Sequence, residues 1–483
     1  MAIADWPWLT IKRREKEVQV VSKMIVSGGR LVLPSGVRKT DLLIEDEKIA
    51  AVGDSRHFGH ADHMIDASGR IVLPGLVDVH VHFLDRFMGS VSLQDYFSGT
   101  KSAAFGGVTT IIDFAHQEKG QSLAQAIQLK REEADGHVTI DYGLHAGITD
   151  PTPETLSEMR SVIRSGIPSF KVYTIYDDFM IDDGSLLAVF EEAVRQRGLV
   201  MLHAENDKIA KYRVREFLGS GKTSAVYHAL SKPNIVEEEA IQRIALLARS
   251  AGAPFYVVHL STREGKKIIE EYRKQSFPAF SETCTHYLCL TDEVYEQANG
   301  INYIISPPLR KEQDLIALWG GLVDGSISVV SSDDCSFSDD AKLMGKDSFD
   351  RVPNGMAGVE LRLPFLYSEG VRKGRISLER LAEITSTNPA RIFGLFPRKG
   401  VIQPGADADL VLLDPDKEVT MSLDSIHMAA DFCFLEGKKL KGYPVMTISR
   451  GKVIIQDNRF IGHEGDGRFI ERKIDFHAIK YLR

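Results

Sequence analysis

Cysteine is scarce in this sequence. Only four of the 483 residues are cysteines, namely Cys284, Cys289, Cys335 and Cys433. They are too few and too scattered for a disulfide framework, and no Cys-x-x-Cys pair is present that would suggest a thiolate zinc site. Such sparse usage is typical of a protein kept in a reducing compartment, so we expect a cytoplasmic localisation.

Long apolar runs and an excess of positive charge are also absent. No stretch reaches the roughly 18 consecutive apolar residues that a membrane helix needs, and the first residues lack the pattern of a secretory signal. Lys and Arg number 59 against 67 Asp and Glu, which gives a formal net charge of -8. This mild acidity argues against a nucleic-acid footprint and against a polybasic membrane surface. We therefore expect neither nucleic acid nor a membrane as a partner.

The local sequence pattern divides the chain into three main regions and two extensions. Short strand-like runs separated by turns fill residues 21–72 and again residues 396–457, whereas residues 73–395 alternate apolar runs with helical stretches. Because chain ends are often close in space, the two β-rich parts are expected to form one composite β-sandwich. Residues 1–20 form an N-terminal extension. Residues 458–483 form a C-terminal extension that either contacts a neighbouring subunit or is disordered.

The alternation of strands and helices over roughly 300 residues predicts a parallel α/β architecture. Expected helices include residues 122–133 and 237–251. The length suits a (β/α)8 barrel of the TIM type. A doubly wound open sheet is the alternative, but no Gly-x-Gly-x-x-Gly motif follows an early strand.

Two histidines stand one residue apart at the end of the first apolar run of this region. They are His80 and His82, which follow the stretch Ile71 to Val77. On a β-strand, residues i and i+2 point to the same face, so both imidazoles project together. Alone, such a pair is more often two hydrogen-bonded histidines in a turn, but it also forms half of a metal site.

Further polar residues end or lie within later apolar runs, in the positions where barrel enzymes place their active sites. They are Lys171, His203, His259 and Asp333. Each has an ordinary explanation by itself, since a histidine can be a core residue, the lysine can snorkel and the aspartate can cap a helix. Together with His80 and His82 they predict a shared metal site.

Lys171 needs a chemical explanation, because an ammonium is not a metal ligand. Carboxylation of its amine by CO2 would give an anionic carbamate, N6-carboxylysine, whose two oxygens can bridge two divalent cations. Two metals roughly 3.5–4 Å apart can hold a hydroxide between them. Four imidazoles, a bridging carbamate and one carboxylate suit two borderline metals such as Zn2+.

The chain resembles the cyclic amidohydrolases, and within them the hydantoinase/dihydropyrimidinase group. The resemblance spans about residues 24 to 472. It rests on these segments: Phe105 to Ala115, Lys119 to Leu123, His203 to Asn206, Ser281 to Cys284, Ser306 to Arg310, Pro353 to Gly355, Asn388 to Arg391, and Gly400 to Asp409. It implies an amidohydrolase barrel with a composite β-sandwich, and tetramers are usual in this group.

The resemblance also implies a two-metal centre and a reaction. One metal would be held by His80, His82, the carbamylated Lys171 and Asp333, and the other by His203, His259 and the carbamate. A metal-bridged hydroxide would attack the amide carbon of a five- or six-membered cyclic diamide. Asp333 would act as general base and then as general acid, giving an N-carbamoyl amino acid.

Residues around the centre receive roles by the same resemblance. Tyr176 matches a tyrosine that hydrogen-bonds the oxyanion, and Ser306 and Asn354 match residues whose backbone groups pair with the substrate. Candidate lid residues over the ring substituent are Phe87, Tyr173, Phe179 and Met180.

Three places depart from the pattern of the group. Asp334 stands where a histidine is usual, and an extra carboxylate close to Asp333 would raise the pKa of that base. The stretch Phe83 to Met88 replaces one that contains a proline, and Met356-Ala357 replaces Gly-Pro. These departures concern the choice of substrate more than the chemistry.

Other functions are weighed against this one. A dihydroorotase needs an arginine two residues after the second histidine, where this chain has Leu84. Allantoinase stays open as an alternative, although its substrate carries a polar ureido arm and the candidate lid is largely apolar. A non-catalytic scaffold protein of the same fold is disfavoured, because this sequence has a ligand-type residue at all six metal-ligand positions.

Overall fold

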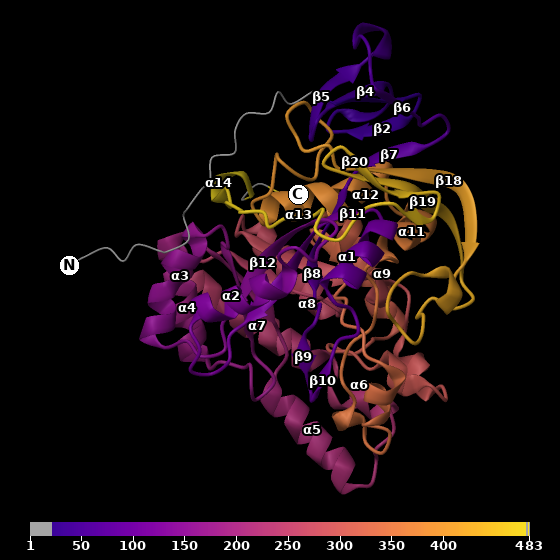
Figure 1. The fold of residues 1–483 in the computed structure, drawn as a ribbon. Coiled ribbons are helices and arrows are strands. Elements are labelled where there is room, and N and C mark those ends of the chain that lie inside the picture. Colours follow the sequence, from indigo (N-terminus) through magenta and orange to yellow (C-terminus); the bar gives the residue numbers. More distant parts are fainter. Residues whose placement is uncertain (1–21, 480–481, 483) are drawn as a thin grey trace, which may run out of the picture.

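The computed structural model describes residues 22–479 and 482, so the N-terminal extension expected over residues 1–20 lies outside the described residues. Its centre is a sheet of eight parallel strands that curls into a barrel (Figure 1). In chain order the strands are β8 (Leu76–Val81), β11 (Val108–His116), β12 (Asp141–Gly147), β13 (Ser169–Tyr173), β14 (Leu199–His203), β15 (Phe255–Val257), β16 (Ala279–Cys284) and β17 (Val329–Ser331).

Each strand pairs in parallel with the strand that precedes it in the barrel order, and the ring closes where the chain leaves β17. Val81 and Asp334 form a parallel bridge there, and the amide of His82 donates to the carbonyl oxygen of Asp334 at 2.8 Å. Because all eight strands run the same way, their carboxyl ends meet at one rim of the barrel.

Helices follow most strands and cover the outside of the barrel. The longer ones are α1 (Tyr96–Phe105), α2 (Leu123–Ala134), α3 (Pro153–Arg164), α4 (Asp183–Gln196), α5 (Asp207–Gly219), α6 (Val226–Ser231), α7 (Asn234–Ala251), α8 (Arg263–Lys274) and α9 (Glu312–Asp324). Short helices α10 (Asp339–Leu343), α11 (Arg362–Phe365), α12 (Leu378–Ala382), α13 (Asn388–Ile392) and α14 (Phe476–Ile479) follow.

The ends of these helices show why the expected boundaries were close. Ser122 caps α2, and its hydroxyl accepts from the amide of Gln125 while the Gln125 side chain accepts from the amide of Ser122. The helix α7 begins three residues before the expected position, after Pro233, and ends at Ala251, where Gly252 follows with a left-handed backbone.

Two further sheets form a β-domain beside the barrel. One contains β5 (Lys48–Gly53), β4 (Asp41–Glu45), β1 (Lys23–Ser27) and β6 (His63–Asp66). The other, in spatial order, contains β21 (Arg459–Phe460), β20 (Lys452–Gln456), β19 (Lys439–Ser449), β18 (Leu410–Thr420), β7 (Ile71–Pro74), β2 (Arg30–Leu33) and β3 (Gly36–Lys39). Buried side chains of both sheets, such as Leu42 and Leu412, share one core.

The second sheet joins the two ends of the chain, because β7 pairs with β18 and Leu73 lies opposite Val411. The fold class is thus confirmed as a parallel α/β barrel with a flanking β-domain that both ends of the chain build. Lys399 fastens the two parts, since its buried ammonium lies 2.6 Å from both Asp141 at the start of β12 and Asp409 before β18.

Part of the C-terminal extension lies against the barrel of its own chain. The amide of Ile470 donates to the carbonyl oxygen of Tyr142, and the buried guanidinium of Arg472 donates to the carbonyl oxygen of Leu144 and, at 3.0 Å, to the hydroxyl of Ser169. These contacts lie away from the rim at which the strands end.

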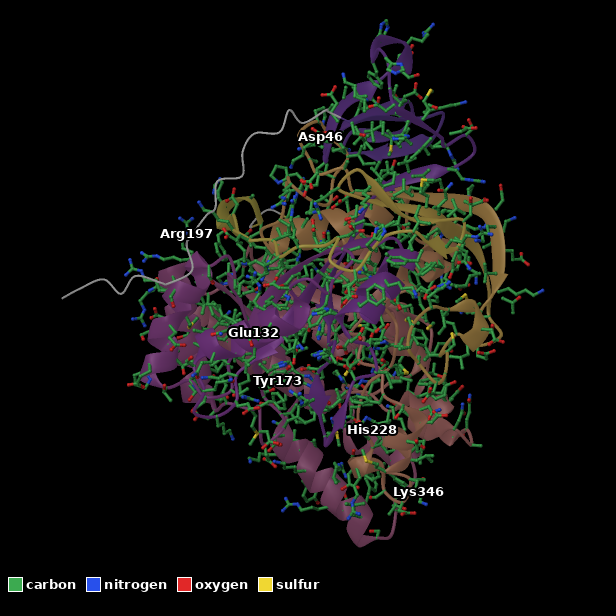
Figure 2. The ribbon with its side chains drawn as sticks, in the orientation of Figure 1. Asp46, Glu132, Tyr173, Arg197, His228 and Lys346 are labelled. Atoms are coloured by element: carbon green, nitrogen blue, oxygen red, sulfur yellow. The ribbon has the colours of Figure 1, made fainter. Side chains whose placement is uncertain are left out.

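At the rim, α5 projects from the body of the molecule (Figure 1). A small hairpin of β9 (Arg86–Phe87) and β10 (Ser90–Val91) follows β8 on the same side. In Figure 2, Tyr173 at the end of β13 lies in the middle of the molecule, and His228 of α6 lies nearer to α5. None of the helices within residues 22–479 has the length and hydropathy of a membrane-crossing segment.

Candidate active site

The six residues expected as metal ligands line one small cavity at the rim, with a volume of about 70 Å³. Each lies on a barrel strand or within two residues after one. They are His80, His82, Lys171, His203, His259 and Asp333. The structure therefore brings all six together, although they span more than half of the chain.

The imidazoles approach one another in two pairs. His80 Nε2 lies 3.2 Å from His82 Nε2, and His203 Nδ1 lies 2.9 Å from His259 Nε2. Asp333 Oδ1 lies 3.0 Å from His80 Nε2, and atoms of His80, His259 and Asp333 fall within 4.8 Å of one another. Imidazole nitrogens at such distances must share a proton or a cation, so the donor set fits a metal ion.

Three carboxylates fix the second ring nitrogens of these histidines. Glu282 accepts from His80 Nδ1, Asp85 accepts from His82 Nδ1 at 2.6 Å, and Glu205 accepts from His203 Nε2 at 2.7 Å. Metal-binding histidines commonly donate their second ring N–H to a carboxylate, which fixes the tautomer and raises ligand basicity. This arrangement leaves the cavity-facing nitrogens free to act as ligands.

These three carboxylates were missed by the sequence reasoning. Glu205 and Asp85 follow their histidines by two and three residues, and that proximity was a usable signal. Glu282 gives no such signal, because it lies 202 residues from His80 and only the barrel brings the two together. Tyr256 of β15 completes this support by donating to Glu282 at 2.8 Å.

The protonation of the histidines reflects their charged surroundings. Burial lowers the pKa of His82, but the carboxylates of Asp333 and Asp85 outweigh it and raise the pKa to about 9. Burial lowers the pKa values of His203 and His259, so these two imidazoles are neutral. A positive charge is thus favoured beside Asp333, and neutral nitrogen donors stand on the other side of the cavity.

Lys171 is the unusual member of the set. It is 1% exposed, and its ammonium lies 4.7 Å from the centroid of the Phe114 ring and 5.0 Å from that of Tyr173. Among the described residues it makes no hydrogen bond and no ion pair. Burial lowers its pKa to about 8. A buried lysine without a hydrogen-bonding partner is costly in its charged form, so the free amine or a modified form is favoured here.

Three site residues have backbone conformations with positive φ. The φ angles are 74° at Tyr176, 37° at His259 and 51° at Asp333. Such conformations are uncommon for residues other than glycine, and they cluster at functional sites because the surrounding structure must hold them. Here they turn the chain at the rim, so that these side chains line the cavity.

Asp333 is held as an ionised carboxylate. Burial raises its pKa, but His80 and His82 outweigh this effect and keep the pKa well below the usual value. Cys284 and His286 also lie close, with ligand atoms within 4.8 Å of an Asp333 oxygen. Asp333 is therefore enclosed by nitrogen and sulfur groups.

Asp334 points away from this centre. Its carboxylate accepts from the amides of Gly358 and Val359 at 2.7 and 2.9 Å, and from the side-chain amide of Gln94 at 2.6 Å. Burial raises the pKa of Asp334 to about 6. The departure from the family pattern thus serves packing at the barrel closure, and these contacts direct its charge away from Asp333.

Replacing Asp334 with alanine should lower the free energy of unfolding by about 2–4 kcal/mol, because three buried donors lose their acceptor. Asp334→Asn should cost less than about 1 kcal/mol. Its amide oxygen can accept from both backbone N–H groups, and Gln94, whose Oε1 lacks a partner, can turn to accept from the new amide. Urea unfolding of both variants measures this difference, and equal losses would contradict the argument.

The residues expected to bind substrate form a hydrogen-bonded group at the cavity wall. Asn354 Nδ2 lies 3.3 Å from both the Tyr176 hydroxyl and Ser306 Oγ. Lys232, which the sequence reasoning missed, donates to Ser306 Oγ at 2.5 Å and to Glu205 Oε2 at 3.3 Å. Side chains rather than backbone groups thus make the contacts within this group.

Three of the four candidate lid residues line the cavity as a cluster of rings. The Phe87 ring centroid lies 5.1 Å from that of Tyr176 and 6.1 Å from that of Phe179, and Tyr173 lies 5.2 Å from Phe179. Met180 does not line the cavity. It instead supports the turn, since its amide donates to the Tyr176 carbonyl oxygen at 2.7 Å.

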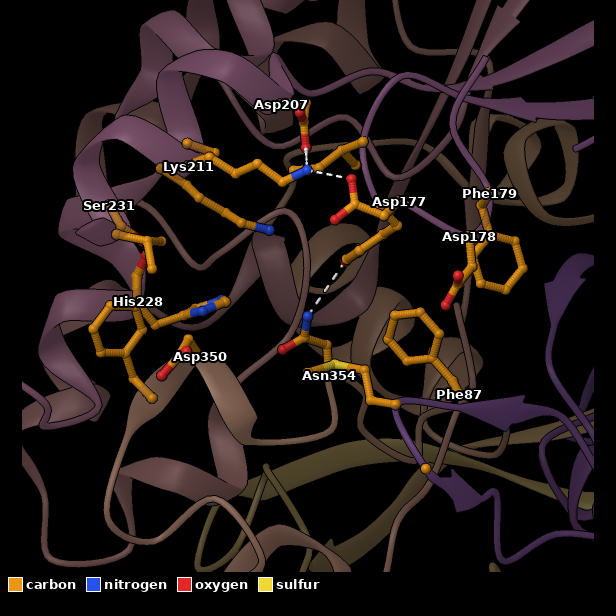
Figure 3. A pocket seen from close by; sticks show the side chains of 18 of the residues that line it. Phe87, Asp177, Asp178, Phe179, Asp207, Lys211, His228, Ser231, Asp350 and Asn354 are labelled. Atoms are coloured by element: carbon orange, nitrogen blue, oxygen red, sulfur yellow. Dashed lines mark hydrogen bonds and ion pairs between the residues drawn. The ribbon is translucent and has the colours of Figure 1, made fainter. Parts of the chain in front are cut away.

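Beyond this lid lies a wider groove of about 860 Å³, between the β9–β10 hairpin, α5 and α6. Figure 3 shows Phe87 beside Phe179 on one side of the groove and Lys211 on the other. The Lys211 ammonium contacts the carboxylate of Asp177 and, at 2.9 Å, that of Asp207. The groove shares Phe87, Tyr176 and Asn354 with the small cavity.

A barrel with histidines and a carboxylate gathered at the carboxyl ends of its strands defines a hydrolase of the metal-dependent amidohydrolase class. The chain belongs to the Amidohydrolase family, whose model matches residues 71–454.

The relatives of this chain include hydantoinases and a dihydropyrimidinase. The chain is 41% identical over 454 residues to a D-hydantoinase from Ralstonia pickettii, with 93% of this chain and 99% of the relative covered. The crystal structure of a dihydropyrimidinase from Brevibacillus agri NCHU1002 superposes with a TM-score of 0.92 at 39% identity, covering 93% and 99% of the two chains. An L-hydantoinase (dihydropyrimidinase) from Arthrobacter aurescens gives 0.85 at 31% identity over the same shares.

Proposed function

We propose that the protein hydrolyses the ring amide of a five- or six-membered cyclic diamide, a hydantoin or a 5,6-dihydropyrimidine, to an N-carbamoyl amino acid. The observation that carries this proposal is the convergence of six ligand-type side chains on one small cavity at the rim of the barrel. The names of its relatives, hydantoinase and dihydropyrimidinase, agree with it.

The cavity is proposed to hold two divalent ions, with Zn2+ as the metal. His80, His82 and Asp333 would hold one ion, His203 and His259 the other, and the carbamate of Lys171 both. The surroundings of the Lys171 amine support this carbamate, since the unmodified side chain contacts two aromatic rings but has no hydrogen-bond or ion-pair partner among the described residues. Bound metals supply Lewis acidity and an activated water.

Four side chains of the protein have the remaining roles in the proposed reaction. Asp333 takes a proton during attack on the amide carbon and gives a proton to the ring nitrogen when the carbon–nitrogen bond breaks. Tyr176 donates its hydroxyl proton to the oxygen on which negative charge develops. Ser306 and Asn354 hold the edge of the ring next to Tyr176.

The dimensions of the site indicate where a substituent lies. A volume of about 70 Å³ has room for the ring alone, so a group attached to the ring must pass Phe87, Tyr173 and Phe179 into the wider groove. These rings favour an apolar first part of the substituent. The same lid disfavours allantoin, whose polar ureido arm would have to lie among them, and allantoinase is the second candidate function.

The oligomeric state and the cellular location of the protein are also part of this proposal. We expect a homo-oligomer, with a tetramer favoured by the family, located in the cytoplasm. The four cysteines form no disulfide with one another. Exposed apolar side chains on neighbouring helices, such as Tyr212 of α5 and Leu230 of α6, are available for subunit contacts.

Purified, metal-replete protein should hydrolyse dihydrouracil, hydantoin and both enantiomers of 5-phenylhydantoin, with the phenyl compound favoured by the aromatic lid. Product formation is followed as the N-carbamoyl amino acid. A chelator should remove activity, and added Zn2+ should restore it. Turnover of allantoin without turnover of the other substrates would instead establish the second candidate.

A further inference from the structure

One buried cation beside the cavity has no role in the reaction described above. Lys232 follows α6 and is 7% exposed. Its ammonium lies 2.5 Å from Ser306 Oγ and 3.3 Å from Glu205 Oε2, and 5.5 Å from the centroid of the Tyr176 ring. It thus stands between the carboxylate that orients His203 and the wall at which the ring of the substrate is expected.

The position of Lys232 is fixed by contacts of its own segment. His228 of α6 donates from Nε2 to the carbonyl oxygen of Ile305 at 2.7 Å, directly before Ser306. Arg310 donates to the carbonyl oxygen of Lys232 from the other side. The end of α6 and the segment that carries Ser306 are therefore held together on both sides of the ammonium.

The hydrogen bonds of Ser306 have a consequence for its proton. A hydroxyl group offers one O–H donor and two lone pairs. Both lone pairs of Ser306 Oγ are used, because Lys232 Nζ and Asn354 Nδ2 donate to it. The hydroxyl proton is left for a third partner, which is the Tyr176 oxygen or a group in the small cavity that both residues line.

We propose that Lys232 is a positioning residue that makes the Ser306 hydroxyl a donor directed into the cavity, toward a carbonyl oxygen of the cyclic amide. This inference rests on the proposed function. The charge of the ammonium also polarises the Ser306 hydroxyl, which strengthens the bond that this hydroxyl donates. Asn354 completes the arrangement, since its amide donates to Tyr176 as well and leaves the Tyr176 proton free to donate.

A double-mutant cycle tests whether Lys232 acts through Ser306. Lys232→Met removes the charge and keeps the length of the side chain, and Ser306→Ala removes the hydroxyl. Each single change should lower kcat/KM about 10- to 100-fold. The double variant should be no more than about threefold worse than Ser306→Ala alone, because Lys232 has then nothing left to orient.

Two further variants separate positioning from structure. Lys232→Arg keeps a cation and should recover most of the activity that Lys232→Met loses. Metal content, measured by mass spectrometry of the elements, should stay at the wild-type level in every variant. Should Lys232→Met fail to fold, Lys232→Ala, which likewise lacks an N–H donor in its side chain, takes its place in the cycle.

Independent, multiplicative losses of kcat/KM in the double variant would overturn the inference. Loss of metal in Lys232→Met would overturn it as well, because Lys232 would then act through Glu205 and His203 and not through Ser306. Wild-type kcat/KM in Lys232→Met would overturn it too. Failure of the proposed function is a different result, because then the wild-type protein itself hydrolyses none of the cyclic diamides.

Discussion

Lys171→Ala should lower kcat by about a thousandfold or more and should reduce the metal content below two ions per chain. The reason is that the proposed carbamate is the one group shared by both ions, whereas each imidazole belongs to one ion only. Loss of a ligand from a metal site lowers both the affinity of the site for its metal and the catalytic activity. Element analysis and steady-state kinetics on the same preparation measure the two effects.

The buried position of Lys171 makes a control possible. The alanine variant leaves room beside Phe114 and Tyr173 in which a short carboxylic acid such as propionate can stand for the carbamate. Propionate should therefore restore part of the activity of Lys171→Ala and should leave the wild-type protein unchanged. Bicarbonate should promote metal loading of the wild-type apoprotein alone. Equal occupancy of two ions in the variant and the wild type, with equal kcat, would exclude the carbamate.

The convergence of the six candidate ligands was predictable from the sequence because each lies within or directly after an apolar strand run. His203 ends β14, and His80 and His82 lie at the end of β8. In a barrel of parallel strands, such positions meet at one rim whatever their separation along the chain. The fold class followed from the same alternation of strands and helices, and the structure confirms it.

Contacts between elements distant in sequence could not be predicted in this way. Lys232 follows a helix and lies 74 residues before Ser306, so no local pattern relates the two. The same holds for Glu282 and His80. The sequence also did not decide which way the Asp334 side chain points, because a residue beside a strand end can face either the cavity or the barrel wall. Its hydrogen bonds to Gly358 and Val359 decide that question.

The candidate lid residues were named from the family resemblance, and their polar surroundings could not be predicted from the sequence. The rings of Phe87 and Phe179 come from segments after two different strands. The groove beyond them is formed by five separate segments, and the ion pairs of Lys211 with Asp177 and Asp207 link two of these. Only the arrangement of α5 against the Tyr176 turn brings them together.

Asp333→Asn should lower kcat by about 10^3-fold, within the range that a proton-transfer group contributes, and should leave the fold intact. Asparagine keeps the shape of the side chain and tolerates the left-handed backbone at this position, where φ is 51°. What it loses is the charge that accepts a proton. Because its histidine neighbours hold the pKa of Asp333 well below the usual value, the carboxylate is ionised throughout the neutral range, and the loss should be the same from pH 6 to 9.

The neighbouring residue offers a matched control. Asp334→Asn makes the same chemical change one residue later, on a carboxylate that faces Gln94 and the backbone amides rather than the cavity. It should keep kcat within about threefold of the wild type, because no proton of the reaction reaches it. Kinetics of both variants at matched metal content decide the assignment. Comparable losses in the two, or an active Asp333→Asn, would show that proton transfer does not depend on Asp333.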